Sequence, residues 1–99
     1  MEWVTPQSEP LSKLALLNSR LTRLRGAVKS GEGPTRVRKA AEKVRLAQLS
    51  VIKAKLALVV EYPQRDPGGR QLANLRDQEA QWQTLTVEEI IEQFGRPEA

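Results

Sequence analysis

The longest helix-compatible stretch of the chain runs from Pro34 to Tyr62 and contains no glycine or proline after its first residue. Ala, Leu, Lys, Arg, Glu and Gln fill most of its interior, and all of these favour helices. Pro34 suits a first helical position, whereas the ring of Pro63 disfavours helix at Tyr62. The stretch therefore predicts one helix about 40 Å long, because each residue adds about 1.5 Å.

The apolar side of this predicted helix changes character along its length. In the first half it is a narrow stripe of small residues, such as Ala40 and Ala41. In the second half it is broad and bulky, with Ile52, Leu56 and Val59. A narrow stripe needs one neighbouring helix and a broad one needs two, so we expect the second half to lie inside a bundle.

A second apolar seam precedes this helix, and its residues recur at intervals of three and four. Such spacing is typical of one side of a helical hairpin. Between the two helices, Gly31 is suited to a left-handed helix end and Gly33 to the start of the next helix. So short a connection makes the helices antiparallel neighbours, at about 11–30 and 34–62. The seam consists of Leu14, Leu17, Leu21, Leu24 and Val28.

Outside the two long helices, the sequence predicts an N-terminal arm, a loop and a C-terminal helical cap. Residues 1–9 are expected to be a flexible arm, and the Pro- and Gly-rich stretch 63–70 is expected to be a loop. One or two shorter helices follow within 71–95, and Thr86 with Glu89 forms a capping-box pattern. The sequence thus predicts a single all-α domain over 1–99, a small three- or four-helix bundle.

Composition excludes several kinds of chemistry. The chain has no cysteine and no histidine, so disulfides, thiolate nucleophiles, typical zinc sites and imidazole bases are ruled out. We find no phosphate-binding glycine loop, no acid cluster with metal spacing and no nucleophile–base set. We therefore expect a non-enzymatic protein with no catalytic residues, metal or cofactor. No apolar run reaches membrane-spanning length and no signal peptide is recognisable, so we expect a cytoplasmic protein without membrane contact.

The net charge of +4 conceals a strong asymmetry. Residues 11–60 hold twelve Lys and Arg against two acids, which gives +10. Residues 61–99 hold four Arg against eight acids, which gives −4, and residues 1–10 add −2. The predicted hairpin is therefore the basic part of the chain.

Basic side chains spaced three and four residues apart form a ridge along the hairpin. Such a ridge is a plausible footprint for nucleic-acid phosphates. The basic region lacks aromatic groups for stacking, which argues against sequence-specific reading of single strands. An acidic protein partner, or a solvated surface without a specific ligand, would also account for the charge. The predicted nucleic-acid contacts are Arg20, Arg23, Arg25, Lys29, Arg36, Lys39 and Lys43.

Large apolar residues outside the predicted seams suggest an alternative, a protein that assembles with itself or serves as an adaptor for an acidic partner. A homodimer or a larger complex would complete the burial of these side chains. Trp3 either folds back on the bundle or anchors a partner. The predicted interface residues are Trp3, Leu16, Leu46 and Leu58.

Three short stretches resemble known families. The ending from Leu85 to Pro97 resembles the opening of helix-turn-helix units, but Ala99 stands where a recognition helix would begin, so we expect a capping helix. The hairpin turn from Gly31 to Arg38 is loosely similar to that of a helical-hairpin protein of the large ribosomal subunit. Arg65-Asp66-Pro67 and Arg70 resemble a turn of the chorismate mutases, which implies a small all-helical enzyme as a remote alternative.

Overall fold

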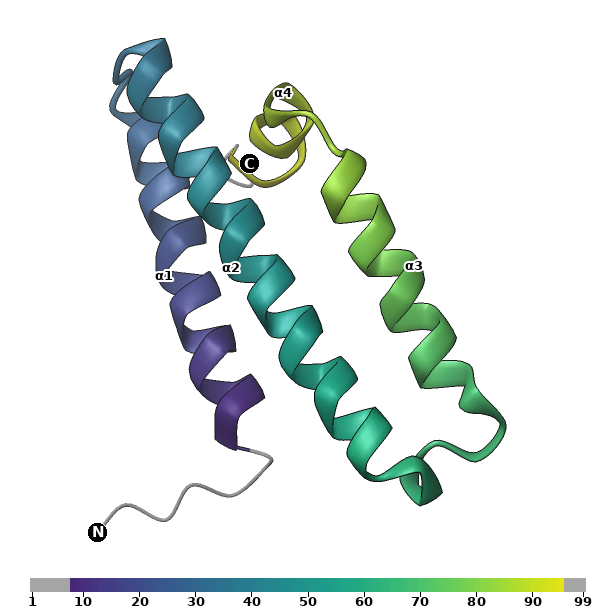
Figure 1. The fold of residues 1–99 in the computed structure, drawn as a ribbon. Helices are drawn as coiled ribbons and strands as arrows, with labels where there is room; N and C mark the ends of the chain where they lie inside the picture. Colours follow the sequence, from purple (N-terminus) through teal and green to yellow (C-terminus); the bar gives the residue numbers. More distant parts are fainter. Residues whose placement is uncertain (1–7, 96–99) are drawn as a thin grey trace, which may run out of the picture.

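The computed structural model describes residues 8–95, and it is all-α (Figure 1). Helix α1 spans Ser8–Lys29 and α2 spans Pro34–Glu61. After two 3₁₀ turns come α3, Arg70–Thr84, and the short helix α4, Val87–Ile90. A π-helical turn, Ile91–Gly95, follows α4 directly. Among these residues, no helix combines the length and apolar character that crossing a membrane requires.

The hairpin of α1 and α2 confirms the central prediction. Gly31 has a φ of 67°, the left-handed conformation that glycine adopts easily, and it lies two residues after Lys29, the last residue of α1. Gly33 precedes α2 and Pro34 is its first residue, while Tyr62 follows its last turn. Helix α1 begins at Ser8, a few residues earlier than the expected start near residue 11. Trp3 and most of the expected arm lie outside the described residues.

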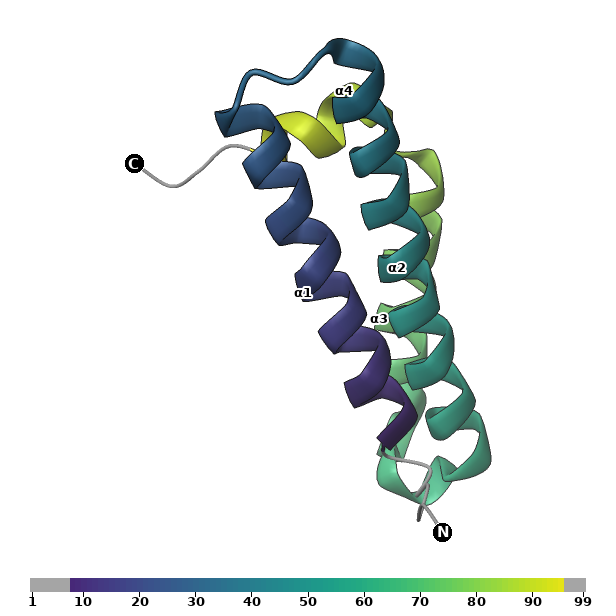
Figure 2. The same ribbon diagram turned by 90° about the vertical axis from the view of Figure 1, so that its left-hand side faces the viewer.

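Helix α2 lies between its two neighbours. Figures 1 and 2 show α1 on one side of α2 and α3 on the other, with both running antiparallel to it. In the described part of the chain, no Cα atom of α1 comes within 8 Å of one in α3. The two outer helices therefore each pack on α2, and their backbones stay apart from each other.

The predicted loop contains two 3₁₀ turns, Pro63–Arg65 and Pro67–Gly69. Asp66 follows the first turn and is buried, with 8% of its surface exposed. Its carboxylate accepts hydrogen bonds from the backbone N–H groups of Gln71 at 2.9 Å and Leu72 at 3.0 Å. Asp66 thus satisfies two of the unpaired donors in the first turn of α3.

Residues 87–95 form what we call the C-terminal wedge, which packs against α1 and α2 near the hairpin turn (Figure 2). The predicted capping box is confirmed: the Thr86 hydroxyl accepts a bond from the Glu89 N–H at 3.1 Å, and the Glu89 side chain bonds back. Ile90 is fully buried, and the Phe94 ring lies 5.1 Å from that of Trp82 on α3. The wedge therefore ties all three helices together at this end.

The distribution of burial along α2 differs from our expectation. Its fully buried positions end at Ala54, and Leu56, Leu58 and Val59 in the broad half are only partly buried. The narrow half, expected to touch one partner, contacts both α1 and the wedge. The expected two neighbours of the broad half are confirmed, since α1 and α3 both pack on α2, but Leu56, Leu58 and Val59 still remain partly exposed between them.

Candidate nucleic-acid interface

The outer side of α2 carries a line of exposed cations. Arg36, Lys39 and Lys43 are spaced three and four residues apart, so they share one side of the helix. Lys53 continues the line toward the other end. The buried residues Ala40 and Val44 pack the adjoining side of α2 against its neighbours. The core packing of α2 therefore fixes which way this line of charge faces.

Glu32, in the hairpin turn, pairs with two of the predicted contacts. Both terminal nitrogens of Arg23 donate to its carboxylate, at 2.9 and 3.0 Å, and Arg36 lies 3.8 Å away. The hydrogen bond from Arg23 holds the pKa of Glu32 below its ordinary value. Much of the charge of Arg23 is therefore neutralised within the hairpin, and Arg36 is partly neutralised.

Arg25 also has an internal partner. Its Nε donates to the backbone carbonyl of Phe94 at 3.2 Å, which links α1 to the C-terminal wedge. Its charge is not neutralised by a carbonyl, but its position is fixed. Within the part of the chain whose side chains are described, the other predicted contacts form no hydrogen bond or ion pair: Arg20, Lys29, Lys39 and Lys43.

An open hollow of about 410 Å³ lies between α2 and the start of α4. We call it the basic hollow. Three cations, one acid, one hydroxyl group and one apolar side chain line it, and two of the cations are predicted contacts. The lining residues are Thr35, Arg38, Lys39, Glu42, Lys43 and Val87.

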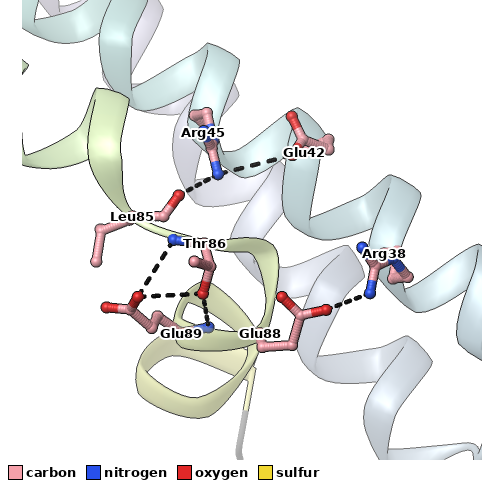
Figure 3. A network of polar contacts seen from close by, with 7 residues as sticks. All are labelled: Arg38, Glu42, Arg45, Leu85, Thr86, Glu88 and Glu89. Carbon is pink, nitrogen blue, oxygen red and sulfur yellow. Dashed lines mark hydrogen bonds and ion pairs between the residues drawn. The ribbon is translucent and has the colours of Figure 1, made fainter.

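Two arginines of α2 contact α4 and the residues just before it (Figure 3). Arg38 forms an ion pair with Glu88, and Arg45 donates to the backbone carbonyl of Leu85. Arg45 also lies 3.7 Å from Glu42, so the acid of the hollow has a cation of its own. The hydrogen bond from its own backbone N–H, and then Arg38, lower the pKa of Glu88. Glu88 therefore remains charged at neutral pH.

The chemistry of this surface suits an anion. Lysine and arginine tips with a nearby hydroxyl group bind phosphate or carboxylate oxygens through charge-assisted hydrogen bonds. In residues 8–95 there is no group of three or more acidic, histidine or cysteine side chains that could hold a metal ion.

The predicted apolar interface residues differ in exposure. Leu46 is 62% exposed on the outer side of α2 and Leu16 is 43% exposed on α1, whereas Leu58 is partly buried. Trp3 lies outside the described residues. We did not predict that Val60 would be 64% exposed, although it ends the broad half of α2.

The stretch that resembles a chorismate mutase turn has local roles in this fold. Arg65 lies over the ring of Tyr62, with its guanidinium carbon 5.2 Å from the ring centre. Asp66 bonds to the backbone at the start of α3. Arg70 is exposed as the first residue of that helix. These contacts account for Arg65 and Asp66 without a substrate.

The predicted contacts did not include Arg38, although it borders the basic hollow and adjoins Lys39 in sequence. Its position among the cations of residues 36–43 could have indicated this role from the sequence alone. Val87 and Glu88 could not have been found this way, because their position beside α2 depends on how the wedge docks. The basic hollow is therefore a product of tertiary packing.

Comparisons of the chain with protein-family models, with curated proteins and with solved structures gave no match.

Proposed function

We propose that this protein is a non-enzymatic binding module whose basic hairpin contacts the phosphates of duplex nucleic acid. The observation that supports this most is the set of four predicted cations without an internal partner in the described chain: Arg20, Lys29, Lys39 and Lys43. Free cations release the counterions condensed on nucleic acid when they bind phosphates, which is a major source of affinity.

The spread of these cations fits a duplex. Lys29 ends α1, whereas Arg20 lies nine residues before it and Lys43 lies nine residues after Pro34. Because the helices are antiparallel, Arg20 and Lys43 lie level, about 14 Å along the hairpin from its turn. Nine helical residues separate Arg20 from Lys29 and place these two cations on opposite sides of α1, so the free cations that share one surface are Lys39 and Lys43, about 6 Å apart along α2. A duplex carries one charge per about 1.7 Å of its axis, so this pair spans several phosphates.

A titration of a fluorescently labelled duplex at several salt concentrations tests the proposal. If about six phosphates are engaged, the plot of log K against log salt should have a slope near −5. Duplex DNA and duplex RNA of the same length serve as separate probes. Failure to bind either probe at low salt would exclude the proposed function.

A double variant, Lys39→Ala with Lys43→Ala, should weaken binding about tenfold or more and reduce the slope by about 2. The matched control is Arg70→Ala with Arg76→Ala, which removes the same charge from exposed positions on α3. The control should lose much less affinity. Equal losses in the two double variants would show that net charge, and not the hairpin surface, drives binding.

A second candidate function is assembly, with another copy or with an acidic protein. It is favoured by Leu46, which is 62% exposed amid the cations of α2. Buried interface cores are rich in such apolar groups, and cations at the rim suit an acidic partner. Light scattering at high concentration should then show a dimer that Leu46→Ser abolishes. A strict monomer would exclude self-assembly, and the Lys39/Lys43 double variant should leave a homodimer nearly unchanged.

A further inference from the structure

We infer that the basic hollow is the phosphate-docking subsite of the hairpin, and that the carboxylate of Glu88 holds Arg38 there until a phosphate replaces it. The inference rests on the proposed function and names the place on the surface where one phosphate would dock. It also assigns a role to Arg38 and Glu88, neither of which is among the predicted contacts.

The first step of the argument is the charge around the hollow. Arg38, Lys39 and Lys43 line it together with one acid, Glu42. Arg45 lies 3.7 Å from Glu42 and offsets its charge. The hollow therefore keeps a surplus of positive charge from its cations, while most of its lining surface is apolar.

The second step is the state of the three cations. In the described chain, Lys39 and Lys43 have no partner, whereas Arg38 is paired with Glu88. Glu88 belongs to the C-terminal wedge, which is otherwise held by the buried Ile90 and by the contact between Phe94 and Trp82. Losing the ion pair would therefore not release the wedge.

The third step is how easily the pair can exchange partners. The side chains of Arg38 and Glu88 are 56% and 64% exposed, so water screens their attraction. A phosphate held by Lys39 and Lys43 would present oxygens to the same guanidinium and can accept two parallel hydrogen bonds from it. The carboxylate thus occupies a position that a phosphate of a bound duplex would compete for.

The test is a double-mutant cycle on duplex binding, measured by fluorescence anisotropy across a range of salt concentrations. Glu88→Gln keeps the size of the side chain and removes the competing charge. We expect affinity at low salt to rise about three- to tenfold and the salt slope to steepen by about 1, since one more phosphate is engaged. In an Arg38→Ala background, Glu88→Gln should change affinity less than twofold, because the arginine that it frees is gone.

The matched control is Glu61→Gln, which makes the same charge change on an exposed residue at the far end of α2. Its effect should be at most about twofold, with an unchanged slope. If Glu61→Gln raises affinity as much as Glu88→Gln, or if the gain persists in the Arg38→Ala background, the inference is overturned. Wild-type binding with a steep salt slope would still support the proposed function in that case.

Circular dichroism on each variant guards against misfolding. If Glu88→Gln lost helical signal, Arg38→Ala alone would decide the matter, because it removes the subsite cation and leaves the wedge packing intact. Arg38→Ala should then lose at least twice as much affinity, as a fold-change, as Arg76→Ala on α3. Equal losses would overturn the inference.

Discussion

The two ends of the hairpin are built from similar aliphatic residues, yet they bury them very differently. At the end with residues 30–33, which we call the turn end, Leu24, Val44 and Ile90 are fully buried. At the other end, which we call the open end, Leu14 is 39% exposed and Val60 is 64% exposed. At the turn end, the C-terminal wedge packs against both helices of the hairpin. At the open end, α1 packs on α2 and α3 also packs on α2.

This contrast shows that a third element, rather than hydrophobicity alone, completes the core of a hairpin. Two helices in contact leave the rest of each apolar face to solvent. The wedge covers that face at the turn end. At the open end, α3 packs on α2, no Cα atom of α1 lies within 8 Å of one in α3 in the described chain, and Leu14 of α1 remains exposed.

The largest expected loss of stability comes from a comparison of two leucine-to-alanine variants on α1. Leu24→Ala should lower the free energy of unfolding by about 2–5 kcal/mol, because it leaves a cavity in a fully packed site. Leu14→Ala removes the same atoms from the open end and should cost less than about 1 kcal/mol. Urea denaturation measures both, and equal losses would break the comparison.

A pair of glycines tests the fit of the wedge. A Cβ atom on Gly95 would lie 3.3 Å from Val28 Cγ2 and 3.4 Å from Leu24 Cγ. Gly95→Ala should therefore destabilise the protein by about 1–3 kcal/mol through overpacking. Gly26→Ala, inside α1 with nothing within 4 Å of its added Cβ, should instead stabilise by about 1 kcal/mol. Thermal melts that shift in the same direction would contradict the close fit of Gly95.

At the open end, stability should depend on Asp66 more than on apolar burial. Asp66→Ala leaves two backbone donors of α3 without their partner and should cost about 0.5–2 kcal/mol. Asp66→Asn keeps one acceptor oxygen but turns its NH2 group toward the other backbone donor, so it should recover only part of the stability that Asp66→Ala loses. Urea unfolding followed by tryptophan fluorescence measures both variants, and a negligible loss in Asp66→Ala would contradict the role of these two hydrogen bonds.

The smallest expected effect is a pH dependence at the turn end. The pKa of Glu32 is lowered in the folded state, so on acidification the unfolded chain binds the proton first. The stabilisation from Glu32 is therefore complete above its ordinary pKa of about 4.3 and is lost as pH falls through the lowered value. The difference in urea midpoint between wild type and Glu32→Gln should shrink from pH 6 toward about pH 3. A difference that does not change with pH would contradict this role.

Much of the fold could be predicted from local signals. Gly31, Pro34 and Pro63 mark the helix limits because each restricts the backbone in a known way. The capping box at Thr86 is a contact between neighbours in the sequence, so the pattern alone was sufficient. These features depend on residues a few positions apart.

What could not be predicted depends on docking. The broad apolar half of α2 predicts two neighbouring helices. The width of an apolar face does not predict how completely those neighbours bury its side chains. The same holds for the cations. Arg23 and Arg25 resemble Lys39 in the sequence pattern, and they differ from it because Glu32 and the Phe94 carbonyl lie within their reach.

The position of α2 between two helices that do not meet has a consequence for how the molecule opens. In the described chain, the first half of α3 packs on α2, and its backbone stays apart from that of α1. This half of α3 can therefore unfold locally while α1 and α2 stay packed together. The amides there should exchange with solvent long before those around Leu24, which need global unfolding. The packing of α1 on α2, which positions the cations of the hairpin, would persist through such excursions.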